Sequence, residues 1–257
     1  MTNFSDWLSF CLNELVKISD KEVFLVGGYL RERLLLKNSF DFDFTVYSNA
    51  LEMARKLAYK THGAYVLLDP ERKTARVVWN KDKFGFELNF DIATIFGNNI
   101  ENDLKHRDLT INAIAVELNS SVIEKILEPD YHFSKDELID PSNGFDDLKN
   151  KLIRTFNEKN FLDDPLRMLR VFRFAAKLDF VIEPQTIIYI KKNSRLINNP
   201  AKERLLKELF SIFSAKNSFY QLQKMNDVRL LKYMFQNISF ENSLKKVNIL
   251  EEIFNNL

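Results

Sequence analysis

The chain has 257 residues, of which 46% are hydrophobic and 28% charged, with a formal net charge of +1 at pH 7; these values are typical of a globular protein with a sizeable core and exclude a polycationic chain. The single cysteine, Cys11, excludes an intramolecular disulfide and indicates a reducing compartment, cytoplasmic or organellar. No apolar run reaches the roughly 18 residues of a membrane span, and the first residues lack the basic and apolar regions of a signal peptide, so we expect no membrane partner.

The first part of the chain alternates between helical and strand patterns. In chain order, we expect a helix over 1–20, a strand over 22–28, a helix over 29–37, a strand over 40–47, a helix over 50–63, and strands over 64–69, 74–80 and 86–94. The segment 107–118 opens polar and continues as an apolar helix or strand, between which periodicity does not decide. This alternation predicts a mixed sheet with helices packed on it.

A turn-rich segment with proline and glycine over 140–148 predicts a domain boundary near 145–155. Beyond it every segment has a helical pattern; the expected helices cover 161–178, 184–195, 201–215, 217–225, 227–235 and 242–255. The predicted fold class is therefore α+β, with a mixed-sheet head followed by an all-helical part.

Positive charge is concentrated in the second half of the chain. Residues 149–207 hold 14 lysines and arginines against 6 acidic residues, a net charge of +8. This asymmetry favours a surface that faces a polyanion and, equally, a solvated basic helical face.

Two aspartates alternate with phenylalanines in the strand pattern "FDFDFTV". Side chains at i and i+2 of a strand point to the same face, so Asp41 and Asp43 project together while Phe40, Phe42 and Phe44 face the core. A half-buried strand of any function has this pattern. Two carboxylates on one face are also the hard oxygen ligands that Mg²⁺ takes together with substrate phosphates.

Gly27 and Gly28 end a predicted strand and precede a predicted helix. Glycines at such a turn let a phosphate approach backbone N–H groups at the positive end of the helix, although a tight strand-to-helix turn alone also explains them. Arg31 lies in the first turn, where the helix dipole disfavours a cation, and its position favours an anionic ligand shared there.

Five motifs occur in order and together cover roughly residues 22–235. They are "GGYLRERLLL" followed by "FDFDFTV", "HRDLTINAIA" (106–115), "DPSNGFDDL" (140–148), "DDPLRMLRVFRFAAKLDF" (163–180) and "ERLLKEL" (203–209). In sequence and order these motifs resemble the class II tRNA nucleotidyltransferases (CCA-adding enzymes) and the related bacterial poly(A) polymerases. The resemblance implies a nucleotidyltransferase head over 1–145, a helical, nucleotide-selecting neck over 146–215 and the start of a truncated helical body over 216–257.

The resemblance also implies an activity, template-independent transfer of C, and in some members A, from CTP or ATP to the 3′ end of tRNA with release of pyrophosphate. Asp41 and Asp43 are then the catalytic ligands of Mg²⁺, and Gly27, Gly28 and Arg31 contact the nucleotide.

The motif at 163–180 carries the second group of expected site residues. Arginines at i, i+3 and i+6 indicate by spacing alone an amphipathic helix with a solvated basic face. The resemblance implies instead that Asp164 and Arg167 hydrogen-bond the Watson–Crick edge of the incoming base, since cytosine and adenine both present an amino group beside an acceptor. Arg170 and Arg173 then face the triphosphate or the structural partners of the helix.

The motif at 106–115 implies that Arg107 contacts the nucleotide and that Asp108 has an orienting role. Asn112 is expected to assist these two residues. His106 stands where the family has an arginine, which removes a permanent cation. Asp91 is expected as a third carboxylate near the metal, with an edge-facing aspartate as the alternative.

The connection over 95–106 is short, which in this family is linked to CC-adding activity and favours that subtype. Two alternatives remain open, a poly(A) polymerase of the same superfamily and a non-catalytic RNA-binding relative. The intact aspartate pair argues against the second, because binding alone does not require it.

Overall fold

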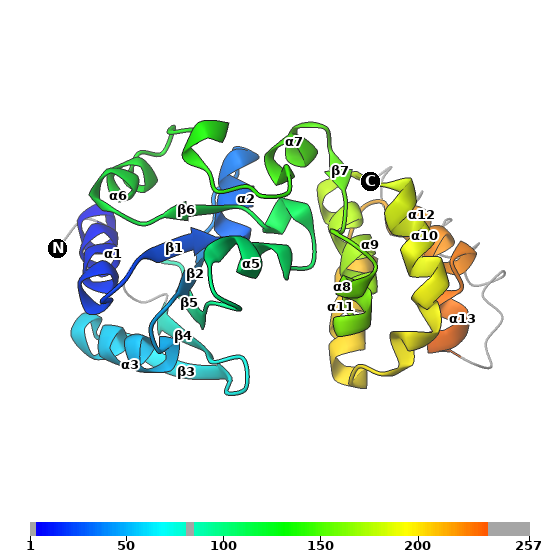
Figure 1. The fold of residues 1–257 in the computed structure, drawn as a ribbon, viewed down its shortest axis with the longest axis horizontal. Helices are drawn as coiled ribbons and strands as arrows, with labels where there is room; N and C mark the ends of the chain where they lie inside the picture. Colours follow the sequence, from blue (N-terminus) through cyan, green and yellow to red (C-terminus); the bar gives the residue numbers. More distant parts are fainter. Residues whose placement is uncertain (1–3, 81–84, 236–257) are drawn as a thin grey trace. The chain divides into compact units, whose positions relative to one another are not determined.

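The computed structural model describes residues 4–80 and 85–235, and its contacts divide the chain into two units. The first unit comprises residues 1–106 and 111–145, and the second comprises 107–110 and 146–257. Figure 1 shows the elements of each unit in chain order. The division into three domains proposed from the sequence stays a prediction. Among the described helices, none is long and apolar enough to cross a bilayer.

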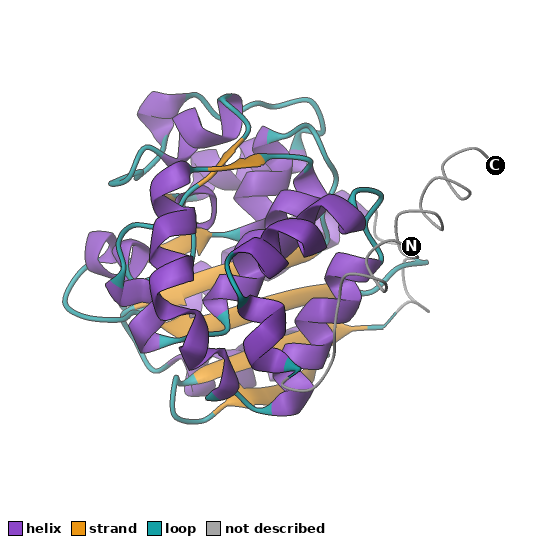
Figure 2. Cartoon of the chain, turned by 90° about the vertical axis from the view of Figure 1, so that its right-hand side faces the viewer, coloured by secondary structure: helices purple, strands orange, loops and turns teal. Residues whose placement is uncertain are grey.

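The first unit is built on a six-stranded sheet with the order β3-β4-β5-β2-β1-β6 (Figure 2, orange). Its strands are β1 Val23–Val26, β2 Asp41–Val46, β3 Ala64–Asp69, β4 Thr74–Trp79, β5 Leu88–Thr94 and β6 Ala115–Glu117. Strands β2 and β5 run parallel, and the other neighbours pair antiparallel. The prediction of a mixed sheet is therefore confirmed.

Helices of the first unit pack against this sheet. The first unit contains α1 Phe4–Ile18, α2 Gly28–Leu34, α3 Ala50–Thr61, α5 Ile100–Lys105 and α6 Ser120–Leu127, and α7 Gly144–Lys149 spans the division between the units. Tyr29 of α2 stacks on Phe42 of β2 with ring centroids 4.1 Å apart, and Trp7 of α1 meets Trp79 of β4 edge-on at 5.1 Å. These contacts fix which face of β2 is core and which is left to polar side chains.

The strand pattern of "FDFDFTV" is confirmed for two of its three phenylalanines. Phe42 and Phe44 are 2% and 1% exposed. Phe40 is 38% exposed, so its expected place in the core is wrong. It precedes the first residue of β2 and stacks instead on Phe86, with ring centroids 3.9 Å apart.

The segment 107–118, left undecided by periodicity, contains both a turn of helix and a strand. A 3₁₀ turn covers Thr110–Asn112 and strand β6 covers Ala115–Glu117. Strand β6 pairs with β1, so its apolar residues complete one edge of the sheet.

The second unit is mainly helical. It contains α8 Lys159–Asp163, α9 Arg167–Leu178, α10 Pro184–Asn193, the 3₁₀ helix η3 Ser194–Asn198, α11 Lys202–Phe213, α12 Ser218–Asp227 and α13 Leu230–Met234. Two short parallel strands, β7 Leu152–Ile153 and β8 Val181–Ile182, were not predicted, because two residues are too few to show a period. The helix predicted over 242–255 lies outside the described residues.

The single helix predicted over 161–178 is divided. Helix α8 ends at Asp163 and α9 begins at Arg167. Pro165 lies in the break and has no N–H to donate to a preceding turn. The break places Asp164 and Arg167 at a corner between two helices.

Candidate functional site

Asp41 and Asp43 lie on the face of β2 opposite Phe42 and Phe44, as the alternation predicts. The carboxylate of Asp41 is exposed and accepts a hydrogen bond from Nδ2 of Asn89 at 2.9 Å. Asp43 is half-buried and accepts from the backbone N–H of Gly28 at 3.0 Å. Each carboxylate therefore accepts a hydrogen bond from a neutral donor, and this bond does not neutralise the negative charge of the carboxylate.

The two glycines are required by geometry. Gly27 has φ +68°, a left-handed conformation that glycine adopts without steric cost. Gly28 starts α2, and a Cβ built there would lie 3.0 Å from Oδ2 of Asp43. The turn thus brings a backbone N–H directly onto one of the two carboxylates.

Asp91 stands beside Asp43 in the parallel register of β2 and β5. It forms a bidentate ion pair with Arg76 of β4, at 2.5 Å from Nε and 2.8 Å from Nη2. This hydrogen-bonded pair, aided by the charges of Asp41 and Asp43, raises the pKa of Arg76.

The ion pair argues against Asp91 as a third metal ligand. In the part of the chain that the structure describes, no group of three histidine, cysteine, aspartate or glutamate side chains is placed to hold a metal ion. The carboxylates of Asp41 and Asp43 remain the metal-binding pair that the sequence predicts. Such a set fits a hard divalent cation that completes its coordination with water and phosphate oxygens.

Arg31 is buried, with 6% of its surface exposed, one turn after the glycines. Its guanidinium donates to Oδ1 of Asn112 and, at 2.8 Å, to Oε1 of Glu32. Glu32 therefore balances the charge that the helix dipole disfavours at this position. The expected contact of Arg31 with a nucleotide stays a prediction.

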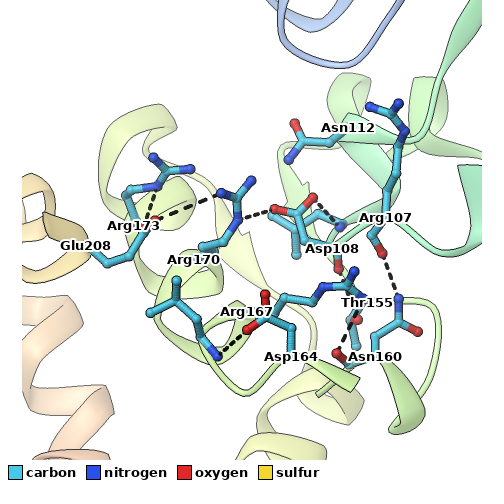
Figure 3. A network of polar contacts seen from close by, with 12 residues as sticks. Arg107, Asp108, Asn112, Thr155, Asn160, Asp164, Arg167, Arg170, Arg173 and Glu208 are labelled. Carbon is cyan, nitrogen blue, oxygen red and sulfur yellow. Dashed lines mark hydrogen bonds and ion pairs between the residues drawn. The ribbon is translucent and has the colours of Figure 1, made fainter. Parts of the chain in front are cut away.

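The second unit contains a network of ion pairs around α9 (Figure 3). Asp108 is 7% exposed and accepts from Nε of Arg170 at 2.6 Å. Glu208 of α11, 6% exposed, lies 2.9 Å from Nε of Arg173 and 3.9 Å from Nη1 of Arg170. The charge of Asp108 is the chief cause that raises the pKa of Arg170. We expected Arg170 and Arg173 to face either the triphosphate or structural partners of the helix. The structure shows structural partners, Asp108 and Glu208.

Asp164 and Arg167 lie at the corner between α8 and α9. Oδ1 of Asp164 accepts from the backbone N–H of Leu166 at 3.1 Å, and its Oδ2 lies 3.1 Å from Nη2 of Arg204. Nη1 of Arg167 donates to the backbone carbonyl of Asn160 at 3.4 Å. These contacts hold both side chains at the start of α9, where the sequence placed them.

Arg107 and Asp108 are anchored through their main chain. The carbonyl of Arg107 accepts from Nδ2 of Asn160 at 2.6 Å, and that of Asp108 accepts from the hydroxyl of Thr155 at 3.2 Å (Figure 3). The second unit therefore gathers six of the predicted residues, and the first unit gathers the other five. The six are Arg107, Asp108, Asp164, Arg167, Arg170 and Arg173; the five are Gly27, Gly28, Arg31, Asp41 and Asp43.

Four residues of these sites were missed by sequence reasoning. Arg204 and Glu208 lie within the motif "ERLLKEL", so their positions were singled out but not their contacts. Arg76 and Asn89 carry no local signal, because their partners come from neighbouring strands.

Two family models match the chain. One, described as "Poly A polymerase head domain", matches residues 23–154. The other, described as "Probable RNA and SrmB- binding site of polymerase A", matches residues 179–241.

Curated relatives match most of the chain. A CC-adding tRNA nucleotidyltransferase of Geobacter sulfurreducens is 35% identical over 201 residues, which is 78% of this chain and 42% of the relative. A CCA-adding enzyme of Ligilactobacillus salivarius is 33% identical over 90% of this chain and 55% of the relative. An A-adding tRNA nucleotidyltransferase of Aquifex aeolicus is 32% identical over 90% of this chain and 28% of the relative. The chain spans about half or less of the length of these relatives.

Solved structures of similar fold cover most of the chain. A Thermotoga maritima CCA-adding enzyme in complex with tRNA matches with a TM-score of 0.77 and 30% identity, covering 97% of this chain and 56% of that one. A tRNA nucleotidyltransferase with a primer tRNA and an incoming ATP analogue matches with a TM-score of 0.73 and 29% identity, covering 91% and 65%.

Proposed function

The chain belongs to the family of tRNA nucleotidyltransferases and poly(A) polymerases, and on this premise we propose that it adds nucleotides from CTP, ATP or both to the 3′ end of tRNA, with release of pyrophosphate. The observation that carries the proposal is the pair Asp41 and Asp43 on one face of β2, with the N–H of Gly28 on Asp43. A pair of carboxylates of this kind is what nucleotidyl transfer requires to hold a metal between enzyme and triphosphate.

Asp41 and Asp43 would hold Mg²⁺, whose hard-oxygen preference suits this donor set. When bound, the metal would lower the pKa of the primer hydroxyl and neutralise the leaving pyrophosphate. Gly28 and Asn89 orient the two carboxylates before any ligand arrives, through the hydrogen bonds to Asp43 and Asp41. Most of the rate enhancement in such a reaction comes from this kind of positioning and charge stabilisation.

Base selection is proposed for Asp164 and Arg167. A carboxylate accepts from the amino group of cytosine or adenine, and a guanidinium donates to the neighbouring ring nitrogen or carbonyl. Oδ2 of Asp164 lies near Arg204, so an incoming amino group would share or replace that ion pair. Uracil and guanine present the opposite donor and acceptor pattern at these positions and would be rejected.

The CC-adding subtype is favoured by the short connection between β5 and the segment at Arg107. This connection is occupied by α5, of six residues, and by a few flanking residues. Two of the similar relatives, from Geobacter sulfurreducens and a Synechocystis species at 33% identity, are CC-adding enzymes. A poly(A) polymerase and a non-catalytic RNA-binding protein are the alternatives.

One assay separates these activities. The chain is incubated with tRNA lacking its 3′ CCA, Mg²⁺, and CTP and ATP singly or together, and the products are sized. Two added nucleotides with CTP alone identify a CC-adding enzyme, three with both nucleotides a CCA-adding enzyme, and a long A tail a poly(A) polymerase. No product in any of these reactions, or with ATP and tRNA that already ends in CC, contradicts catalysis and supports the RNA-binding alternative.

Asp41→Asn and Asp43→Asn are expected to abolish incorporation while leaving the unfolding temperature nearly unchanged, because both side chains lie outside the core. Asp136→Asn, an exposed aspartate on another element, is the matched control and should retain full activity. Near-normal activity of either β2 variant would show that the metal assignment is wrong.

A further inference from the structure

An apolar pocket lies within the first unit, between α1, α2, α6 and the segment 37–40 that leads into β2. It has a volume of about 330 Å³. Its inner wall includes Leu8, Tyr29, Phe42 and Ile126, each of which is no more than 5% exposed. Because Phe42 points to the face of β2 opposite the two aspartates, the pocket is separate from the candidate metal site.

The outer wall of this apolar pocket is positively charged. Arg33, near the end of α2, is half-buried, and Lys37, four residues later, is exposed; both line the pocket. In the part of the chain that the structure describes, no carboxylate forms an ion pair with either side chain. Two cations without an acidic partner therefore border a pocket whose inner wall is apolar.

Arg33 is fixed in position by α6. Its Nη2 donates to the backbone carbonyl of Lys125 at 3.3 Å and to that of Glu128. These carbonyls belong to the C-terminal end of α6, where the helix dipole favours a cation. The carbonyls are neutral, so they hold the guanidinium in place without balancing its charge.

Tyr29 adds a polar group to the apolar wall. Its ring stacks on Phe42, and its hydroxyl has no hydrogen-bond partner among the residues that the structure describes. Burial raises the pKa of Tyr29, so the hydroxyl stays protonated at neutral pH and can donate a hydrogen bond. A largely buried hydroxyl without a partner is unfavourable, unless a ligand or a water molecule accepts from it.

The volume of the pocket decides what kind of ligand fits. Sites for small molecules are mostly apolar hollows of about 300–1,000 Å³ with a few polar groups that orient the ligand. The apolar pocket lies at the lower end of this range. A helix of a protein partner is about 10 Å across and needs a longer groove, so the volume favours a free small molecule.

We propose that the apolar pocket binds a small organic anion with an aromatic body. The aromatic body would lie against Leu8, Tyr29 and Phe42, and a carboxylate, sulfonate or phosphate group would lie beside Arg33 and Lys37. Burial of the ring supplies the affinity, and the two cations distinguish an anionic ligand from a neutral one of the same shape. This site is additional to the proposed function and does not depend on it.

Two fluorescent probes test the proposal on the full chain. Anilinonaphthalene sulfonate is an aromatic anion of the proposed class, and phenylnaphthylamine has the same rings without the sulfonate. Both are titrated with the wild type and with Lys37→Glu, which reverses a charge at an exposed residue and therefore should not disturb folding. We expect the affinity for the sulfonate to fall by about tenfold and that for the neutral probe to stay within about twofold.

Lys21→Glu is the matched control for charge. Lys21 is an exposed lysine of the same unit that does not line the pocket, so its variant should bind both probes within about twofold of the wild type. Equal weakening of both probes by Lys37→Glu, or an equal loss of the sulfonate probe in Lys21→Glu, would show that Lys37 does not select an anion and would overturn the proposal.

A second variant closes the pocket. Ser5 of α1 lines it, and Ser5→Trp should fill part of its volume and weaken both probes by at least about tenfold. Ser121→Trp places the same side chain at an exposed position of α6 outside the pocket and should bind both probes as the wild type does. Thermal unfolding of each variant checks the fold. A folded Ser5→Trp variant that still binds the probes as tightly as the wild type would show that they bind elsewhere; if that variant does not fold, Lys37→Glu still decides the proposal.

Discussion

Gly28→Ala tests whether the turn before α2 positions a catalytic carboxylate. The new Cβ would lie 3.0 Å from Oδ2 of Asp43 and 3.9 Å from Nη2 of Arg31. Carbon and oxygen in ordinary van der Waals contact are about 3.4 Å apart or more, so Asp43 must withdraw by roughly 0.4 Å. The hydrogen bond from the N–H of Gly28, now 3.0 Å, would then lengthen to the limit at which such bonds hold.

The expected loss is kinetic rather than structural. A hydrogen bond to a charged group contributes about 1.5–3 kcal/mol, which corresponds to a loss of about 10- to 100-fold in rate if the bond positions Asp43 for the reaction. The backbone of Gly28 is not in the left-handed region, and alanine in a helix is favoured over glycine by about 0.5–1 kcal/mol. The unfolding temperature should therefore change by no more than a few degrees.

The assay is the rate of CTP incorporation into tRNA lacking its 3′ CCA, with thermal unfolding measured on the same samples. Gly63→Ala is the matched control, since its Cβ would lie 2.6 Å from Cγ1 of Val77 and 2.8 Å from Nε1 of Trp79, away from the aspartates. This overpacking should cost about 1–3 kcal/mol of stability with an unchanged rate per folded molecule. A Gly28→Ala variant that keeps at least half of the wild-type rate, or that loses stability as Gly63→Ala does, would show that this turn does not position Asp43 for the reaction.

Two further predictions concern stability. Hydrogen bonds from Lys125, then Tyr131 and Ser134, lower the pKa of Glu137 from 4.5 to about 2, so the folded state favours its charged form. The charged form of Glu137 therefore stabilises the fold above pH 4.5, and this contribution is lost as the pH falls toward 2. Glu137→Gln should lower the free energy of unfolding, measured in urea at pH 7, by about 1 kcal/mol. A difference in unfolding free energy between the variant and the wild type that does not shrink near pH 2 would contradict this prediction. Glu208→Gln removes the buried carboxylate that pairs with Arg173 and also lies 3.9 Å from Arg170. It should lower the free energy of unfolding by about 2–3 kcal/mol, which a loss below about 0.5 kcal/mol would contradict.

The parts of the site that the sequence predicts well are those whose signal is local. Asp41 and Asp43 share a face because a strand has a period of two, and the glycines stand at a turn that only a short side chain permits. The alternation of elements likewise gives the mixed sheet. At Pro165 a local signal was not used: the pattern predicted one continuous helix over 161–178, whereas the structure has a break between α8 and α9.

The contacts that the sequence could not give are those between distant segments. Asp91 looked like a further metal ligand because its strand pattern resembles that of β2, yet Arg76 of the neighbouring strand neutralises it. Phe40 looked like a core residue because it continues the alternation of β2, but the sheet begins one residue later. In both cases periodicity reports the orientation of a side chain and says nothing about what lies opposite.

The charge of residues 149–207 shows how a count along the sequence misplaces a surface. Arginines of this segment pair with Asp147, Asp108 and Glu208, three carboxylates that lie outside it, so much of its apparent excess of positive charge is compensated within the fold. Arg170 and Arg173 of α9 therefore form neither an open surface for a polyanion nor a solvated basic face.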